Sequence, residues 1–257
     1  MKNLKELNLK DKKIIIFDLD GTLIDSIGVW NMADQRIIYD YSGITEDLDS
    51  VQKNRDFFLN NNPSSDIYIA YCKYLINKYN LSITNPNQLS DIRKDIANEV
   101  LRKDIGFKPN VTRLIYELKA SGYKLALATV TTQEQLEIYY QENKKMLKEM
   151  NIKEVFDLIT TKETVKKKKP DPEVYSIIMN YFFVKPSECL IFEDSYTGVL
   201  AAKNAGIEVV NIYDKYSDLD REKIDSLTDY SIQSYDEFIH HCLNNVKVKK
   251  RKRINNE

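Results

Sequence analysis

At 257 residues, the chain is long enough to bury a sizeable core in one large domain or two smaller ones. Its 38 basic and 39 acidic residues give a formal net charge of -1, so the charge balance gives no indication of nucleic-acid binding. The three cysteines are widely spaced, which argues against a zinc site and against a disulfide framework. No apolar run approaches the ~20 residues that are needed to cross a bilayer, so we expect no membrane span.

The amino-terminal residues 1–13 lack the apolar centre of a signal peptide, so we expect a cytoplasmic protein. The apolar run Ile14-Ile15-Ile16-Phe17 then predicts a strand that is buried on both faces. An acidic turn with Asp18, Asp20 and Gly21 follows it, at the strand end where α/β sheets bind ligands. Two carboxylates so close together repel each other unless a cation or a shared proton compensates them.

Residues 27–103 have apolar side chains at helical spacing, with polar breaks near residues 42–43, 60–63 and 85–87. This pattern predicts several amphipathic helices without an intervening strand. Its aromatic residues are typical of a helix-bundle core, although a few could line a substrate pocket. Among its cations, Lys53 and Arg55 are the candidates for contacts with a substrate.

The second half of the chain alternates between strand and helix patterns. Residues 123–129 predict a buried strand that ends at Thr129, and residues 133–150 predict one long charged helix. The other predicted strands are residues 156–160, 189–192, 208–213 and 229–231, and the other predicted helices are 111–120, 174–181 and one capped by Ser195. Such alternation predicts a parallel sheet with helices on both faces.

The sequence does not support the usual nucleotide-binding sites or histidine-based catalysis. Neither the glycine-rich dinucleotide signature nor the P-loop signature is present, which leaves no sequence grounds for those nucleotide sites. The two histidines, His240 and His241, follow the last predicted strand, so a histidine-based triad or general base is not expected.

Four motifs occur in a fixed order: Asp18-x-Asp20-x-Thr22, Thr129, Lys169-Pro170 and Glu193-Asp194. This order resembles the haloacid dehalogenase-like superfamily, and within it the phosphatases and phosphoglucomutases that carry a helical cap. The resemblance extends from Lys13 to about Phe238. It implies an α/β fold, with a Rossmann-like parallel-sheet core and an inserted all-helical cap domain. The expected boundaries are residues 1–25 and 104–243 for the core, 26–103 for the cap and 244–257 for a basic, disordered tail.

The resemblance also implies a mechanism of phosphoryl transfer. Asp18 would be the nucleophile that forms an aspartyl-phosphate, a reaction that is open to carboxylates. Asp20 would protonate the leaving oxygen and then activate water. Thr129 would donate a hydrogen bond to a phosphate oxygen, and Lys169 would offset the charge of the phosphate and of Asp18.

The implied cofactor is Mg²⁺, a hard cation that prefers oxygen ligands. Its expected ligands are the Asp18 carboxylate, the backbone carbonyl of Asp20 and the Asp194 carboxylate. Glu193 would be either a further ligand or a residue that holds a ligand in place. Without the resemblance, Glu193-Asp194 is also typical of an acidic helix start.

The sequence departs from the family pattern at three positions. Val130 follows the threonine where a small polar residue is usual, so only its backbone N–H could contact phosphate. Lys168 replaces the glycine that commonly precedes Lys169. Trp30 occupies the position where β-phosphoglucomutases usually carry a histidine.

These observations favour a Mg²⁺-dependent phosphatase that acts on a small phosphorylated metabolite such as a sugar phosphate. A hexose-phosphate mutase is the alternative, and a non-catalytic binding protein on the same fold is a third possibility. The basic run at residues 247–253 could bind nucleic acid or an anionic surface through charge alone, but it contains no aromatic residue and we expect it to be solvated. We expect neither a membrane nor a nucleic-acid partner. The sequence predicts neither the oligomeric state nor the exact substrate.

Overall fold

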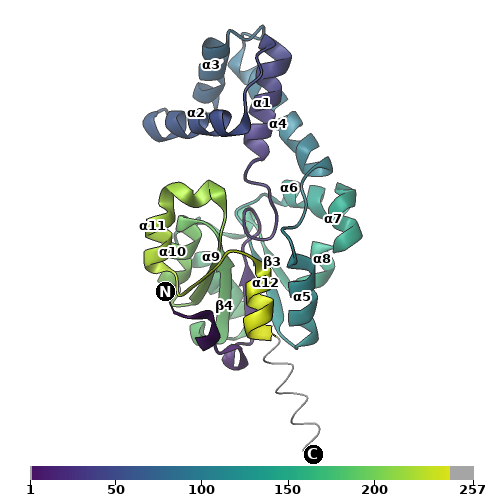
Figure 1. The fold of residues 1–257 in the computed structure, drawn as a ribbon, viewed down its shortest axis with the longest axis vertical. Helices are drawn as coiled ribbons and strands as arrows, with labels where there is room; N and C mark the ends of the chain where they lie inside the picture. The colour runs from purple at the N-terminus through teal and green to yellow at the C-terminus, as the bar shows by residue number, and fades with distance from the viewer. Residues whose placement is uncertain (1, 244–257) are drawn as a thin grey trace, which may run out of the picture. The chain divides into compact units, whose positions relative to one another are not determined.

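The computed structural model describes residues 2–243, so the tail predicted at 244–257 lies outside the described residues. The chain divides into two compact units, and Figure 1 shows the elements of each. The core unit comprises residues 1–25 together with the chain from Gly106 onward, and the insert comprises Ser26–Ile105. Among the described residues, no helix is both long and apolar enough to cross a membrane.

The core unit is built on a six-stranded sheet in which every neighbouring pair of strands is parallel. Its strand order is β3-β2-β1-β4-β5-β6. The chain therefore adds β2 and β3 on one side of β1, and then adds β4, β5 and β6 on the other side. This reversal beside β1 is where α/β sheets open a crevice for ligands. The strands are β1 Ile14–Phe17, β2 Lys124–Ala128, β3 Leu158–Thr160, β4 Cys189–Glu193, β5 Glu208–Ile212 and β6 Tyr230–Ile232.

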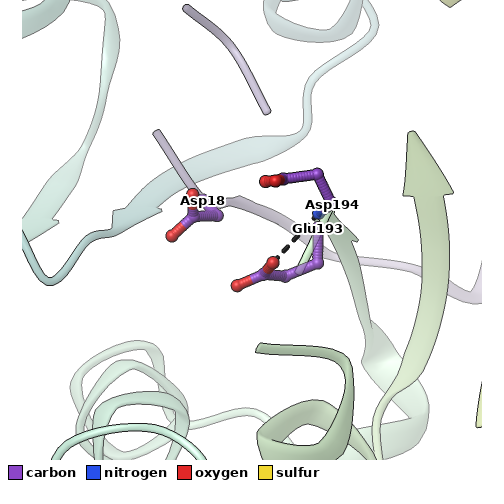
Figure 2. Close-up of side chains that lie close together, drawn as sticks. All are labelled: Asp18, Glu193 and Asp194. Atoms are coloured by element: carbon purple, nitrogen blue, oxygen red, sulfur yellow. Dashed lines mark hydrogen bonds between the residues drawn. The ribbon is translucent and has the colours of Figure 1, made fainter. Parts of the chain in front are cut away.

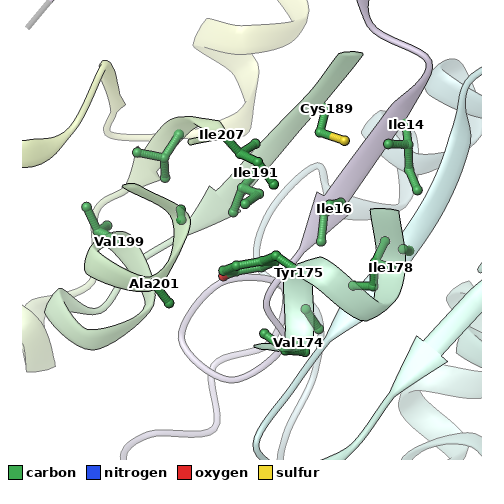
Figure 3. Close-up of a cluster of buried hydrophobic side chains, with 14 of the residues drawn as sticks. Ile14, Ile16, Val174, Tyr175, Ile178, Cys189, Ile191, Val199, Ala201 and Ile207 are labelled. Carbon is green, nitrogen blue, oxygen red and sulfur yellow. The ribbon is translucent and has the colours of Figure 1, made fainter. Parts of the chain in front are cut away.

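Helices cover both faces of this sheet, as the apolar strands require. On one face, α9 (Glu173–Phe182), α10 (Tyr196–Asn204) and α11 (Arg221–Leu227) pack over a cluster of buried side chains. Figure 3 shows the members of this cluster on the strands facing those on the helices. On the other face, Phe192 of β4 stacks on Phe17 of β1, with 4.8 Å between ring centroids, and meets Phe238 edge-on.

The remaining helices of the core unit are short or flank the sheet. They are α5 (Val111–Ala120), α6 (Gln133–Glu137), α7 (Lys144–Glu149), α8 (Ile152–Val155) and α12 (Tyr235–Phe238). The strands agree with the sequence prediction to within about two residues, and the predicted α/β fold is confirmed.

The single long helix predicted over residues 133–150 is wrong. The structure has α6, then a π-helical turn over Ile138–Glu142, then α7. Three consecutive side chains of the turn are buried, which one face of a straight α-helix cannot accommodate. Asn143 starts a new helix because its buried side chain accepts a hydrogen bond from the backbone N–H of Met146.

All four regular elements of the insert are α-helices, as predicted. They are α1 (Val29–Ser42), α2 (Leu48–Asn61), α3 (Ile67–Tyr79) and α4 (Pro86–Lys103). The polar breaks provide their caps. The side chains of Asp47, Asp66 and Asn85 accept backbone N–H groups at three helix starts, and Gly43 ends α1 in the left-handed conformation.

A buried ion pair lies inside the insert. The Arg93 guanidinium of α4 contacts both oxygens of Asp34 of α1, at 2.5 and 3.0 Å, and the Tyr71 hydroxyl of α3 donates to the same carboxylate. The guanidinium also lies over the Trp30 ring, 4.7 Å from its centroid. Three helices therefore meet at one polar cluster, which ties their packing together.

Replacing Arg93 with methionine is expected to lower the free energy of unfolding by about 3 kcal/mol, because Asp34 would remain fully buried without its cation. Arg36 provides the matched control, since its side chain is half exposed and pairs with Glu99 on the surface of the same unit. Arg36→Met should cost less than about 1 kcal/mol. Calorimetric unfolding of both variants tests this difference, and equal losses would contradict it.

The two ends of the insert leave the core unit side by side. Ile24 and Phe107 form an antiparallel bridge, and the backbone N–H of Asp25 donates to the Gly106 carbonyl at 3.2 Å. The N–H of Lys108 donates to the Leu23 carbonyl at 2.9 Å. The two core segments that flank the insert are therefore hydrogen-bonded directly to each other, without help from residues of the insert.

Candidate active site

Three carboxyl groups converge at the carboxyl ends of β1 and β4 (Figure 2). The parallel register aligns Phe17 with Phe192, and the N–H of Asp18 continues the ladder by donating to the Phe192 carbonyl at 3.0 Å. Asp18, Glu193 and Asp194 thus lie next to one another, each with one oxygen within 4.8 Å of the others. All three are buried.

Lys169 places its ammonium group among these acids. Its Nζ lies 2.7 Å from Asp18 Oδ1 and 2.6 Å from Glu193 Oε1, and it donates to the Ala128 carbonyl at 3.0 Å. The side chain is buried, and the ammonium lies 5.6 Å from the centre of the Tyr175 ring. Burial disfavours its charge, but the carboxylates of Asp18 and Glu193 outweigh that effect and raise the pKa of Lys169 well above its ordinary value. The two carboxylates therefore favour the charged form of Lys169.

The acidic charge of the cluster exceeds what Lys169 can offset. Burial raises the pKa of Asp18 well above its ordinary value despite the nearby ammonium. Burial and the neighbouring Glu193 raise the pKa of Asp194 to about 8. Lys169 pairs with Asp18 and Glu193, and the hydroxyls of Thr22 and Ser217 that contact Asp194 carry no charge. An oxygen-rich donor set with surplus negative charge fits a hard divalent cation.

Glu193 organises the site through both of its oxygens. One oxygen accepts the ammonium of Lys169, and the other accepts the backbone N–H groups of Asp194 and Ser195, each at 3.0 Å. A Cβ atom at Gly198, in the first turn of α10, would collide with the Glu193 carboxylate. Glycine at 198 therefore provides the space in which this carboxylate lies.

Asp194 is held by the turn that follows β1. The Thr22 hydroxyl donates to Asp194 Oδ1 at 2.7 Å, and the Thr22 carbonyl accepts the Tyr235 hydroxyl at 2.9 Å. Gly21 has a φ of +80°, and a Cβ at this position would collide with the Asp194 carboxylate. The turn thus needs glycine both for its backbone conformation and for the close approach of Asp194.

Asp20 and Thr129 meet in a second group beside the acidic cluster. Thr129 follows β2, is buried, and donates to Asp20 Oδ2 at 3.4 Å. The hydroxyl of Thr131 donates to the same oxygen, and the Tyr139 hydroxyl donates to Asp20 Oδ1 at 3.3 Å. The Asp20 carboxyl group is therefore contacted at both oxygens.

Sequence reasoning missed several of these residues. Ser195 directly follows the Glu193-Asp194 pair and was expected only as a helix cap, a role that its side chain fulfils by accepting the N–H of Gly198. Gly198 carries no local signal, because glycine is needed there for the Glu193 carboxylate. Tyr139 has no local signal either, because its partner Asp20 lies 119 residues away in the chain.

The two cations of the insert that were predicted as substrate contacts differ from each other. Lys53 is exposed, whereas Arg55 of α2 donates to the Asn31 side chain at 3.1 Å. The pKa of Arg55 is lowered, mainly by burial and to a lesser extent by the positive charge of the nearby Arg93.

Known proteins resemble this chain in both sequence and structure. A family model for haloacid dehalogenase-like hydrolases matches residues 15–212. The phosphorylated carbohydrates phosphatase of Thermotoga maritima is 30% identical over 195 residues, which cover 76% of this chain and 82% of that protein. A probable pseudouridine-5'-phosphatase of Drosophila melanogaster is 29% identical, with 77% and 80% coverage.

A solved structure from Thermotoga maritima, assigned as a beta-phosphoglucomutase, superposes with a TM-score of 0.69. It is 25% identical and covers 91% of this chain and 98% of its own. The family match covers most of the chain and includes every strand that borders the acidic cluster. The chain therefore belongs to the haloacid dehalogenase-like hydrolases.

Proposed function

We propose that this protein is a Mg²⁺-dependent phosphatase that hydrolyses a small phosphorylated metabolite through an aspartyl-phosphate on Asp18. The observation that carries the proposal is the buried cluster of Asp18, Glu193 and Asp194, in which Lys169 pairs with the first two, beside β1 at the reversal of strand order. An anionic nucleophile can approach an anionic phosphate ester only where cations offset both charges.

In the first step, an Asp18 carboxylate oxygen attacks phosphorus while the bond from phosphorus to the ester oxygen breaks. Asp20 gives its proton to the departing oxygen, which leaves as an alcohol. In the second step, Asp20 takes a proton from a water molecule, which attacks the phosphoryl group and releases inorganic phosphate and the Asp18 carboxylate. Thr129 would donate a hydrogen bond to a phosphate oxygen, and Lys169 would offset the charge of both anions.

Mg²⁺ would be held by the carboxylates of Asp18 and Asp194 and by the backbone carbonyl of Asp20. When bound, the cation neutralises surplus acidic charge and withdraws electron density from the phosphate. The raised pKa values of Asp18 and Asp194 mean that the cation must compete with protons for these oxygens. The hydrogen bonds of Glu193 favour a role in positioning Lys169 and Asp194 over direct coordination.

We infer a sugar phosphate as substrate, because the named relatives include phosphatases for phosphorylated carbohydrates and for pseudouridine-5'-phosphate. We further propose that the insert is a cap that selects the leaving group. Hydrolysis is favoured over mutase chemistry because residues 26–105 contain no histidine. Trp30, at the usual histidine position, instead stacks against Arg93 within the insert.

A panel of phosphate monoesters tests the proposal. Purified protein with Mg²⁺ should release inorganic phosphate from at least one sugar phosphate. Excess chelator should abolish the release, and Mg²⁺ should restore it. Metal content is measured in parallel, so that loss of activity is compared with actual removal of the cation.

Three outcomes would count against parts of this assignment. Full hydrolysis after verified metal removal would contradict the cofactor. Conversion of a hexose phosphate into its isomer without phosphate release would favour the mutase. No turnover of any ester, together with saturable binding of one, would favour a non-catalytic protein.

A further inference from the structure

The resting position of Asp20 is set by hydroxyl groups from the segment that follows β2. Thr131 and Thr129 both donate to Oδ2, whereas Tyr139 donates to Oδ1 at 3.3 Å. A carboxyl group contacted at one oxygen can still rotate about the bond to that carboxyl carbon. A contact at the second oxygen limits this freedom, and the Tyr139 hydroxyl makes such a contact.

The π-helical turn places Tyr139 at this position. The N–H of Asn143 donates to the Ile138 carbonyl at 2.8 Å, which is the five-residue hydrogen bond that defines such a turn. The turn buries Ile138, Tyr139 and Tyr140 in succession, and the Tyr139 side chain is almost inaccessible to solvent. Single π turns within helices frequently occur at functional sites.

We propose that Tyr139 is a positioning residue, which orients the Asp20 carboxyl group for proton transfer to the ester oxygen. The inference rests on the proposed function and adds to it a residue that no motif of the family identified in the sequence. A general acid must lie within hydrogen-bond reach of the atom it protonates, and a small displacement lowers the rate strongly. The Tyr139 ring is fixed by its burial, so its hydroxyl provides a rigid reference point for Asp20.

This role predicts a dependence on the leaving group. An alkoxide leaves poorly without a proton, so hydrolysis of an alkyl phosphate requires a correctly placed acid. The 4-nitrophenolate ion is stable without a proton, so 4-nitrophenyl phosphate requires much less help from Asp20. A mutation that only loosened the fold would lower hydrolysis of both esters alike.

The test compares Tyr139→Phe with Tyr140→Phe on the full-length protein with Mg²⁺. The two tyrosines are adjacent in the same turn and both are buried, but the Tyr140 hydroxyl contacts Gln133 and Glu137 instead of Asp20. For Tyr139→Phe, kcat/KM on a sugar phosphate should fall about tenfold, a modest part of the ~10²–10⁴ that general acid catalysis supplies. Its kcat/KM on 4-nitrophenyl phosphate should stay within about twofold of the parent value.

Tyr140→Phe should leave both values unchanged. Thr131→Val, which removes the neighbouring hydroxyl, should show the same selective loss, and Thr131→Ser should restore the rate. These threonine variants test the hydroxyl contacts independently of the tyrosine, should Tyr139→Phe fold poorly. Melting temperatures of all variants are measured alongside.

Equal losses on the two esters, or a Tyr139→Phe rate equal to that of Tyr140→Phe, would overturn the positioning role. If the parent protein is active and Asp18→Asn is inactive, such a result leaves the phosphatase assignment intact. If the parent protein hydrolyses neither ester, the proposed function and this inference both fail.

Discussion

Replacing Asp18 with asparagine is expected to lower phosphate release by about four orders of magnitude or more. The carboxamide has nearly the same shape but lacks the anionic oxygen that we propose as the nucleophile. Folding should be retained, because the substitution removes one acidic charge from a cluster in which burial, and after it Glu193 and Asp194, already raise the pKa of Asp18. Steady-state phosphate release and thermal unfolding of the variant and the parent protein measure both effects.

Asp157→Asn provides the matched control for this experiment. Asp157 precedes β3 at the amino end of the sheet, pairs with Lys124 at 2.9 Å, and accepts the backbone N–H of Leu125. Its carboxamide can still accept that hydrogen bond, so turnover should remain near the parent value. An Asp18→Asn variant as active as Asp157→Asn would exclude Asp18 as the nucleophile.

Gly198→Ala is expected to reduce both stability and turnover, although alanine is the better helix former by about 1 kcal/mol. The new Cβ would occupy the space of the Glu193 carboxylate, which would have to move away from Lys169 and from the N–H groups of Asp194 and Ser195. Overpacking and the broken buried ion pair together should cost about 3 kcal/mol, which outweighs the gain in helix propensity. Turnover should fall about a hundredfold or more, because Lys169, which we propose to face the phosphate, loses its contact with Glu193.

Gly43→Ala separates this collision from the general cost of replacing a glycine. Gly43 has a φ of +73°, but a Cβ added there would meet no other atom within 4 Å. Its replacement should therefore cost about 1 kcal/mol of backbone strain and leave turnover unchanged. A Gly198→Ala variant that is as stable and active as the parent protein would show that Glu193 can move without consequence.

The strands and the acidic residues were predictable because their signals are local. Buried parallel strands appear as continuous apolar runs, and a charged residue directly after such a run lies at the carboxyl end of its strand. Asp18 and Asp194 were found in this way. The family resemblance then linked them to Lys169, which a run of four lysines would otherwise have concealed.

Apart from Thr129, the residues whose hydroxyl groups contact Asp20 were not predictable in this way. The sequence pattern predicts one continuous helix for the segment that contains Tyr139. In the structure this helix is interrupted by a π turn, in which three successive side chains are buried. The contact of Tyr139 with Asp20 also arises only when the segment after β2 folds back over the end of β1. Similarly, the need for glycine at 198 follows from a side chain five residues earlier, which no helix-propensity argument includes.

The backbone pairing between residues 23–25 and 106–108 has a consequence for how this protein can diversify. Since the core unit joins its own ends at this junction, the insert is topologically an enlarged surface loop. The entropy lost on closing a loop rises only logarithmically with loop length, so a long insertion destabilises the core little more than a short one. We therefore expect that the segment between Asp25 and Gly106 can be exchanged as a unit, which would give one hydrolytic centre new substrates while its own residues stay unchanged.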